Sequence, residues 1–245
     1  MKVAAYFGSR EIYYDMLTSC KSLLVNSDVD KVYLLIEDDE FPFELDNTVE
    51  VINISKIVPQ MFRPDSPNYN SRWTYIGLIR AALPKVFPQY DRLLSIDCDT
   101  VVLQDISELW DLDLDDYYLA GVKEPILSGQ HGSLYVNAGV IMMNLAKMRE
   151  DGIDDALIED LNTHYRCFVS QDAINGICRG HILELPGQYN ASYYTTPVSE
   201  WKIHHFAGGF PKGWRDSDEV KEYREMTPLL VSTLHANQLI NHRLM

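Results

Sequence analysis

Two aspartates one residue apart, Asp97 and Asp99, directly follow a short apolar segment at residues 92–96. An apolar run with little alternation is typical of a strand that is buried on both faces. Residues two apart in an extended backbone point the same way, so both carboxylates would leave the sheet on one side. In an open α/β sheet, ligands bind at this carboxyl edge of the strands.

Two carboxylates held close together repel each other and are costly to desolvate unless a positive charge lies between them. A divalent cation with oxygen ligands, Mg²⁺ or Mn²⁺, would supply that charge, and such ions commonly accompany a phosphate or diphosphate. The alternative is a pair of ordinary surface acids in a loop before the helical turn near Asp105. Because an isolated Asp-x-Asp is common by chance, the rest of the chain must decide between the two interpretations.

The composition is that of a soluble globular protein: 245 residues, 46% of them hydrophobic and 23% charged, with a formal net charge of -15. This length allows one large domain or two small ones, and the absence of a repeat or clear linker favours a single domain over 1–245. The acidic charge argues against broad nucleic-acid binding and against a basic membrane-docking patch. The four cysteines show no metal-type spacing and are interpreted as reduced thiols.

No apolar stretch approaches the about 20 residues that a membrane-spanning helix needs. The apolar part of the N-terminus is too short for a signal peptide and continues into an expected first strand. We therefore expect no transmembrane segment and a cytoplasmic location.

The remaining pattern predicts an α/β protein with a mostly parallel sheet. Helices are expected at 73–83 before Pro84, at 145–149, at 153–165 and from Glu219 onward. Two more are expected after Ser9 and after Ser170, and these two serines are the candidate N-caps. Residues 60–71 and 128–133 are expected to be loops. Neither GxGxxG nor GxxxxGK[ST] follows the first strand, so no Rossmann or P-loop fingerprint is present. Strands are expected at 2–7, 32–36, 49–54, 92–96, 117–122, 140–143, 181–185 and 203–206.

Several polar residues fall at expected element ends, and each has a plain structural alternative. Arg80 is either an exposed helix cation or a phosphate or base contact at the mouth of the next strand. Asn137-Ala138-Gly139 is either a tight turn or a segment that lets a ligand approach closely. Asp172 is either a helix cap or, with Gln171, part of a site at a helix N-terminus.

His205 precedes a Gly-rich loop that contains Lys212 and Trp214 and no acid. A lone histidine is more often structural than a ligand. In so acidic a chain, however, a histidine before a flexible basic loop is a candidate ligand.

Together these residues resemble glycosyltransferase family 8, the group of glycogenin and bacterial lipopolysaccharide galactosyl- and glucosyltransferases. The resemblance extends from the first strand to Trp214, and it rests on the order and spacing of motifs that are individually weak. The motifs are Arg80, Asp97-Cys98-Asp99, Asn137-Ala138-Gly139, Gln171-Asp172, Leu185-Pro186 with Tyr189-Asn190, and His205-Phe206-Ala207-Gly208 with Lys212.

The resemblance implies a GT-A fold, a UDP-sugar donor, Mn²⁺ (with Mg²⁺ as the alternative) and transfer with retention of anomeric configuration. Asp97, Asp99 and His205 match the metal ligands, with His204 as the weaker candidate. Lys212 matches a lysine on the diphosphate. The expected donor contacts are Phe7, Ser9, Arg80, Cys98, Glu124, Asn137, Ala138, Gly139 and Gly208, and the expected catalytic pair is Gln171 and Asp172.

Two stretches depart from the family pattern. Lys212-Gly213-Trp214 stands where the family usually has Lys-Pro-Trp, which implies a looser loop over the diphosphate. The first strand ends in residues 6–11, YFGSRE, where the family has Ala followed by acidic and Asn residues that hold uridine. The uracil contacts and the base preference are therefore open.

The resulting expectation is a retaining hexosyltransferase that moves glucose or galactose from UDP to a glycan, glycolipid or glycoprotein. The donor-binding half is expected at 1–125, the acceptor and catalytic half at 126–215 and a helical tail at 216–245; a homo-oligomer is compatible with the sequence. Front-face substitution is favoured because Gln171 is a poor nucleophile, and a covalent route through Asp172 is the second choice. Alternatives are a nucleotidyltransferase, an Asp-x-Asp phosphatase and a non-catalytic or hydrolytic sugar-nucleotide binder.

Overall fold

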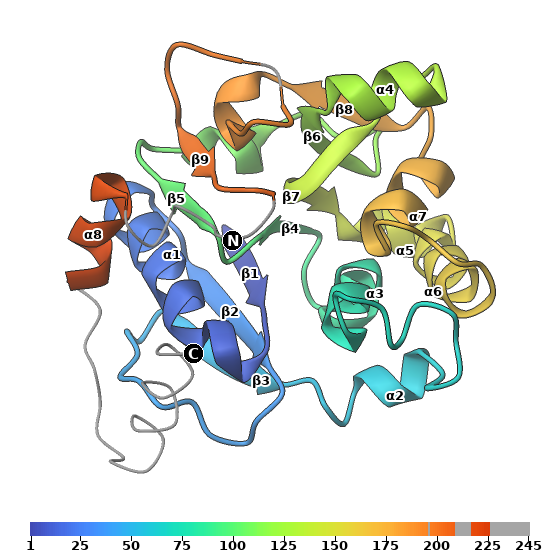
Figure 1. The fold of residues 1–245 in the computed structure, drawn as a ribbon, viewed down its shortest axis with the longest axis horizontal. Helices are drawn as coiled ribbons and strands as arrows, with labels where there is room; N and C mark the ends of the chain where they lie inside the picture. The colour runs from blue at the N-terminus through green and yellow to red at the C-terminus, as the bar shows by residue number, and fades with distance from the viewer. Residues whose placement is uncertain (196, 209–216, 226–245) are drawn as a thin grey trace.

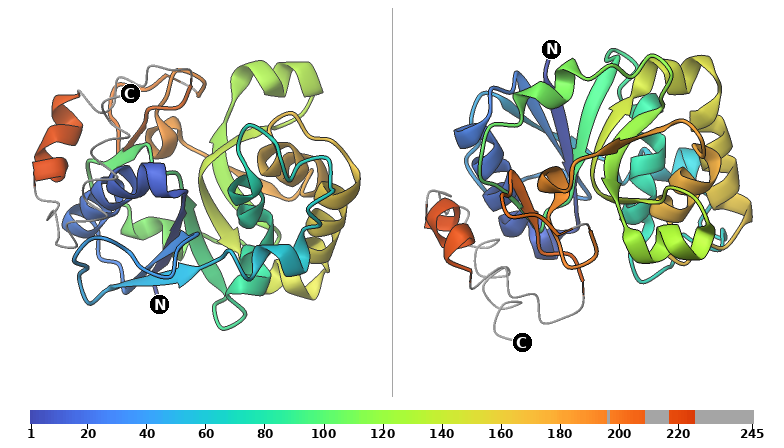
Figure 2. Two further views of the ribbon diagram at one scale, coloured as in Figure 1. Left: turned by 60° about the horizontal axis from the view of Figure 1, so that its bottom comes forward. Right: turned by 90° about the horizontal axis from the view of Figure 1, so that it is seen from above.

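Among the residues that the structure describes, 1–195, 197–208 and 217–225, a seven-stranded sheet runs through the centre of this computed structural model. Helices cover both faces of the sheet (Figures 1 and 2). The strands have the spatial order β3-β2-β1-β4-β7-β6-β8, and a second sheet pairs β5 with β9. Their bounds are β1 Val3–Phe7, β2 Lys31–Ile36, β3 Val49–Asn53, β4 Arg92–Ile96, β5 Thr100–Val102, β6 Leu119–Lys123, β7 Val136–Asn144, β8 Ile182–Leu185 and β9 Ile203–His205.

Most neighbouring strands of the large sheet are parallel. β1 pairs in parallel with β2 and β4, β2 with β3, and β6 with β8. β7 runs antiparallel to both of its neighbours, β4 and β6. The predicted mostly parallel α/β sheet is therefore confirmed. The antiparallel strand lies beside β4, whose carboxyl end carries Asp97.

Alternate residues of the buried strands pack into two cores, one on each face of the sheet. Val3 and Ala5 of β1 belong to the core with α3, α6 and α7, whereas Ala4 and Tyr6 belong to the core with α1. This period of two is what a strand buried on both faces requires. The helices are α1 Tyr13–Asn26, α2 Val58–Met61, α3 Ile79–Val86, α4 Pro125–His131, α5 Leu145–Glu150, α6 Ile153–Thr163, α7 Ser170–Ile177 and α8 Asp218–Glu225, with 3₁₀ turns η1 Arg10–Ile12, η2 Tyr75–Leu78, η3 Ser107–Asp111 and η4 Gly187–Asn190.

The helix α8 packs against α1 at one side of the molecule (Figure 1). The Asn26 side chain donates to the Tyr223 hydroxyl at 2.7 Å, and the Tyr14 hydroxyl donates to the Arg224 carbonyl at 3.0 Å. The predicted helical C-terminal part is confirmed for α8, and residues 226–245 lie outside the described ranges. Within those ranges, none of the helices has the length and hydropathy that crossing a bilayer requires.

The helix predicted at 73–83 starts as the turn η2 and continues as α3 through Pro84, so the prediction that it stops before this proline was wrong. A proline lacks the N–H that would bond to the carbonyl four residues earlier, here that of Arg80. Pro84 lies in the last turn of α3, and the Phe87 N–H still donates to the Leu83 carbonyl at 2.9 Å. The end of α3 therefore loses only the one hydrogen bond that the N–H of residue 84 would have made.

The prediction of a loop at 128–133 was also wrong, because most of these residues belong to the helix α4. Pro125 begins this helix, at a position where the missing N–H has no partner to lose. Gly132 ends it with a φ of 63°, the left-handed conformation that glycine adopts readily after a helix. Pro125 and Gly132 therefore mark the limits of a helix.

Three smaller predictions differ from the structure. Ser9 precedes η1 without a side-chain capping bond, and Ser170 is the first residue of α7 rather than its cap. The strand predicted at 140–143 begins at Val136, so Asn137 and Gly139 lie inside β7. These two residues are therefore held by the sheet and not by a flexible turn.

The central place of β7 can be tested on Ile141, which is fully buried in the core on the α3 side. We expect Ile141→Ala to lower the free energy of unfolding by about 2–5 kcal/mol, because it removes buried methyl groups and leaves a cavity. Val25→Ala on the outside of α1, where the side chain is 52% exposed, should change it by less than about 0.5 kcal/mol. Urea denaturation measures both; equal effects would contradict the burial of β7.

Candidate functional site

The two aspartates lie where the chain leaves β4 and enters β5. The Asp97 N–H donates to the Gly139 carbonyl of β7 at 2.7 Å, which continues the β4–β7 pairing by one residue. After Asp99 the chain forms β5, and β5 pairs antiparallel with β9 so that Thr100 lies opposite His205. The Phe206 N–H also donates to the Asp99 carbonyl at 2.9 Å. This short second sheet brings His205 next to both aspartates, although it is far from them in the sequence.

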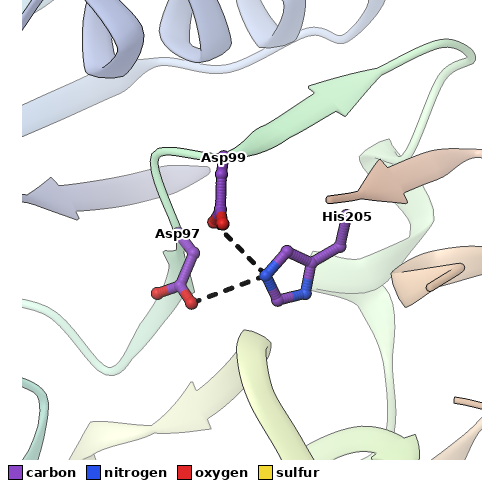
Figure 3. Close-up of side chains that lie close together, drawn as sticks. All are labelled: Asp97, Asp99 and His205. Atoms are coloured by element: carbon purple, nitrogen blue, oxygen red, sulfur yellow. Dashed lines mark ion pairs between the residues drawn. The ribbon is translucent and has the colours of Figure 1, made fainter. Parts of the chain in front are cut away.

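The side chains of Asp97, Asp99 and His205 point toward one another (Figure 3). The Nε2 atom of His205 lies 3.7 Å from Asp97 Oδ2 and 3.3 Å from Asp99 Oδ1. One ligand atom from each of the three residues can be chosen so that all three atoms lie within 4.8 Å of one another. Adjacent ligands of an octahedral ion with bonds of about 2.1 Å are about 3 Å apart, so one divalent cation fits between them. The donor set of two carboxylates and one imidazole suits a transition metal such as Mn²⁺ better than Mg²⁺, which prefers all-oxygen sets.

The imidazole of His205 packs directly on Gly139. A Cβ atom added to Gly139 would lie 2.0 Å from Cε1 and 2.5 Å from Nδ1 of the ring. His205 is 4% exposed, and its Nδ1 lies 2.8 Å from the side-chain oxygen of Asn190. His204 is different: its ring packs in tilted arrangements against Trp201 and Phe206, at centroid distances of 4.2 and 3.9 Å. The geometry therefore brings His205, and not His204, to the aspartates.

Arg80 is 6% exposed, so the alternative of an exposed helix cation was wrong. Its guanidinium pairs with the Asp97 carboxylate, donates to the Ser95 hydroxyl at 3.1 Å and lies 4.6 Å from the centre of the Phe7 ring. A buried arginine beside two carboxylates offsets part of their repulsion. Arg80 therefore orients Asp97 and leaves its Oδ2 atom on the side of His205.

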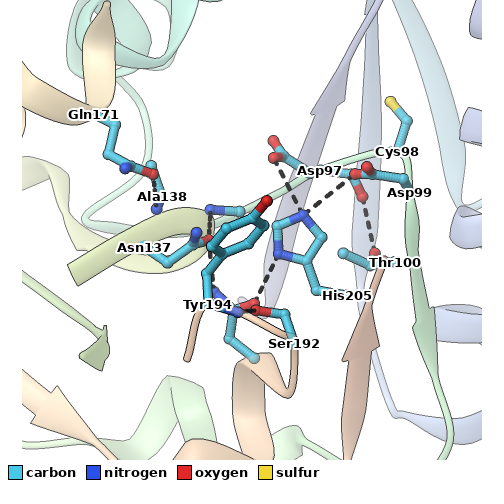
Figure 4. A network of polar contacts seen from close by, with 12 residues as sticks. Asp97, Cys98, Asp99, Thr100, Asn137, Ala138, Gln171, Ser192, Tyr194 and His205 are labelled. Carbon is cyan, nitrogen blue, oxygen red and sulfur yellow. Dashed lines mark hydrogen bonds and ion pairs between the residues drawn. The ribbon is translucent and has the colours of Figure 1, made fainter. Parts of the chain in front are cut away.

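Gln171 and Asp172 lie in the first turn of α7, and the Gln171 side chain meets Ala138 of β7 (Figure 4). The Gln171 side-chain oxygen accepts from the Ala138 N–H at 2.8 Å. The Asp172 carboxylate accepts from the Tyr135 hydroxyl at 2.5 Å and, through its second oxygen, from the Phe168 N–H at 2.9 Å. Both carboxylate oxygens thus have donors, which holds this side chain in one orientation.

Glu124, at the end of β6, is a buried carboxylic acid next to this pair, with 7% of its surface exposed. Burial raises the pKa of Glu124 above its usual value, while hydrogen bonds from Asn137 and Gln171 oppose the rise. Nearby Asp172 also raises it, and His205 lowers it. The side chain is therefore part of the same polar cluster as β7 and α7.

The remaining predicted site residues differ in where they lie. The Cys98 thiol points away from His205 in Figure 4 and donates to the Phe7 carbonyl at 3.3 Å, so Cys98 ties β4 to β1. Ser9 lies just after β1, at the start of η1. Gly208 has a φ of 125°, and a Cβ there would lie 3.0 Å from the Tyr194 ring. Lys212 lies outside the described residues.

The sequence interpretation assigned no role to Tyr135, Asn190 or Tyr194. Tyr135 binds Asp172, Asn190 binds His205, and the Tyr194 side chain lies beside Gly208. Tyr135 and Asn137 are two residues apart in an extended segment, so their side chains point to the same face. This spacing could have indicated that Tyr135 also belongs to the site. The partner of Asn190 depends on how η4 packs on β9, which no local pattern indicates.

Comparisons with known proteins agree with one another. The model of glycosyl transferase family 8 matches residues 19–218. General stress protein A of Bacillus subtilis is 29% identical over 196 residues, which cover 71% of this chain and 68% of that protein. Glycosyltransferase GlyA of Streptococcus pneumoniae is 28% identical over 239 residues, which cover 91% of this chain and 33% of that protein.

Among solved structures, the galactosyltransferase LgtC in complex with donor and acceptor sugar analogues has a TM-score of 0.76 at 16% identity. The superposition covers 97% of this chain and 100% of that one, which confirms the predicted GT-A fold. The chain spans 33% of GlyA and 43% of a Haemophilus influenzae relative. It therefore corresponds to only part of these longer proteins.

The packing of His205 on Gly139 predicts that Gly139→Ala displaces the ring from the two aspartates. We expect the free energy of unfolding to fall by about 1–3 kcal/mol, as for other overpacked sites, and divalent-cation binding to weaken. Gly176→Ala is the matched control. It adds a methyl group to open space in α7 and should be neutral or stabilising by about 0.5–1 kcal/mol. Denaturation and Mn²⁺ calorimetry measure both; unchanged Mn²⁺ binding in Gly139→Ala would contradict the role of this contact.

Because burial raises the pKa of Glu124 in the folded protein, the stability of the wild type should depend on pH more than that of Glu124→Gln. The protonated acid is fully favourable below the unfolded-state pKa, and this advantage is lost as pH rises through the folded-state pKa. Relative to Glu124→Gln, the wild type should therefore become less stable between acidic and neutral pH. Urea denaturation of both proteins across this range measures the difference, and parallel profiles would show that the raised pKa is absent.

Proposed function

Because this chain belongs to glycosyl transferase family 8, we propose that it is a retaining, metal-dependent hexosyltransferase with a UDP-sugar donor. The transferred sugar would be glucose or galactose, and the acceptor would be a hydroxyl group of a glycan, glycolipid or glycoprotein. The observation that carries the proposal is the meeting of Asp97, Asp99 and His205 at the carboxyl edge of the sheet. That edge is where α/β sheets bind nucleotides.

In this proposal Asp97, Asp99 and His205 hold Mn²⁺, with Mg²⁺ as the alternative. When bound, the ion supplies Lewis-acid stabilisation of the negative charge on the departing diphosphate. Arg80 keeps Asp97 in its ligand orientation and contributes a fixed positive charge behind it. Lys212, which the family pattern places on the diphosphate, completes the set.

The proposed sugar platform is formed by Asn137, Ala138 and Gly139 of β7, with Gln171, Asp172 and Glu124 around it. The contacts of Asp172 support front-face substitution over a covalent intermediate. Both of its oxygens accept hydrogen bonds, from the Tyr135 hydroxyl and the Phe168 N–H, and these bonds stabilise the carboxylate and make it a weaker nucleophile. In front-face substitution, the sugar–phosphate bond breaks as the acceptor oxygen approaches from the same side. The departing phosphate oxygen then takes the acceptor's proton.

The proposed donor half is 1–125, with Phe7, Ser9 and Cys98 near the end of β1, and the proposed acceptor half is 126–215, which includes Gly208. The tail at 216–245 begins with α8 on α1. We expect residues 1–245 to form one domain and the protein to act in the cytoplasm. The base preference is the least constrained part of the donor site, because residues 6–11 depart from the family pattern.

The test is a panel of UDP-glucose, UDP-galactose and other nucleotide sugars, each with and without Mn²⁺, measuring thermal stabilisation and donor hydrolysis. We expect stabilisation that requires Mn²⁺ and slow release of UDP with one of the two hexoses. Stabilisation without any release would favour a non-catalytic binder, and release of pyrophosphate from a nucleotide triphosphate would favour a nucleotidyltransferase. Failure of every nucleotide sugar to bind would contradict the proposal.

The two aspartates should differ in importance, because the family pattern implies fuller chelation by the second. We expect Asp99→Asn to lower kcat/KM by more than about a hundredfold, since loss of a metal ligand costs several kcal/mol of transition-state stabilisation. Asp97→Asn should raise the Mn²⁺ concentration needed for activity by less than Asp99→Asn does. Asp105→Asn, an exposed acid that bonds to Ser107, is the control and should keep full activity. Full activity of Asp99→Asn without Mn²⁺ would contradict a metal site here.

A further inference from the structure

Asn190, the last residue of η4, lies behind the imidazole of His205 and is fully buried. Its side chain joins two other residues: it lies 2.8 Å from His205 Nδ1, and its nitrogen donates to the Asn137 side-chain oxygen at 3.0 Å. The backbone is held as well, because the Asn190 carbonyl accepts from the Thr195 hydroxyl at 2.6 Å. A fully buried amide with these partners has one fixed orientation.

The direction of these hydrogen bonds follows from one backbone group. The Gly139 N–H can only donate, and its partner at 2.9 Å is therefore the oxygen of the Asn137 side chain. That oxygen also faces Asn190, so the Asn190 amide must present its nitrogen there and its oxygen to His205. The Asn190 oxygen can only accept. In the neutral imidazole, the hydrogen is thus on Nδ1.

The opposite ring nitrogen, Nε2, then carries a free lone pair. It is this atom that faces Asp97 Oδ2 and Asp99 Oδ1, at 3.7 and 3.3 Å. The neighbouring residue of Asn190 fixes the backbone of the same histidine, since the His205 N–H donates to the Ala191 carbonyl at 2.9 Å. The segment at 190–191 therefore controls both the position and the ring orientation of His205.

We propose that Asn190 is a positioning residue that, held by Asn137, fixes the His205 tautomer with Nε2 free for a cation. The cation itself rests on the proposed function, whereas the tautomer does not. A partner that binds the second nitrogen of a metal-ligating histidine sets its orientation, and its loss typically weakens metal binding about 10- to 100-fold. Asn137 thereby orients Asn190 at the metal site, in addition to its proposed place along the donor sugar.

The first test is ¹⁵N NMR of the metal-free protein with labelled histidine, at a pH where the ring is neutral. The signals of His205 are assigned by their loss in His205→Gln. We expect Nδ1 to have the chemical shift of a protonated nitrogen and Nε2 that of an unprotonated one. The reverse pattern would overturn the proposal whether or not the protein binds a metal.

The second test is Mn²⁺ affinity measured by calorimetry without a nucleotide. We expect Asn190→Leu to weaken binding about 10- to 100-fold. Asn190→Asp restores an acceptor for the Nδ1 hydrogen but loses the donor to the Asn137 side-chain oxygen, so it should recover only part of the loss. Asn68→Leu is the matched control, because Asn68 is also fully buried and bonds to the Leu161 and His164 carbonyls near the end of α6.

Wild-type affinity in Asn190→Leu, or an equal loss in Asn68→Leu, would overturn the positioning role. If the wild-type protein binds no Mn²⁺ either alone or with UDP, the proposed function fails. The NMR spectrum alone then decides between the two tautomers.

Discussion

The repulsion between the carboxylates of Asp97 and Asp99 is the constraint on which the site depends. Two adjacent acids at the end of a buried strand are costly unless positive charge or hydrogen-bond donors surround them. The structure supplies Arg80 on one side, whereas the His205 ring on the other side presents Nε2, which carries no hydrogen in the proposed tautomer. Arg80 neutralises only part of the charge, which leaves the space between the acids and the imidazole favourable for a divalent cation.

The topology of the sheet makes this arrangement rigid. The antiparallel strand β7 lies against β4, so Gly139 is next to Asp97 and offers the flat surface on which the His205 ring rests. The β5–β9 pairing then fixes the register of the histidine against the aspartates. Residues from four strands thus meet with little freedom, as transition-state stabilisation by fixed groups requires.

Much of this could be predicted from local sequence. The apolar run at 92–96 coincides with β4, and the two acids that follow it share one side of the chain. Alternation and apolar runs reflect the local backbone period and the burial of a strand's faces, which explains why they predict strands such as β4. The local sequence made His205 a candidate ligand, and the family resemblance connected it with the two aspartates, which are distant in the sequence.

What the sequence did not indicate depends on tertiary packing. The helix α4 follows from Pro125 and Gly132 as its limits, and the same two residues also suit a loop. The bond between Tyr135 and Asp172 and the bond between Asn190 and His205 join elements whose relative position is set by the whole sheet. No periodic pattern of residue types in the sequence indicates hydrogen bonds of this kind.

The most direct test of the central claim is anomalous diffraction at the manganese edge from crystals grown with Mn²⁺ and UDP. We expect a peak at bonding distance, about 2.0–2.4 Å, from carboxylate oxygens of Asp97 and Asp99 and from Nε2 of His205. A Mn²⁺ peak elsewhere in the chain, or one that persists at this place after both aspartates are replaced, would contradict it.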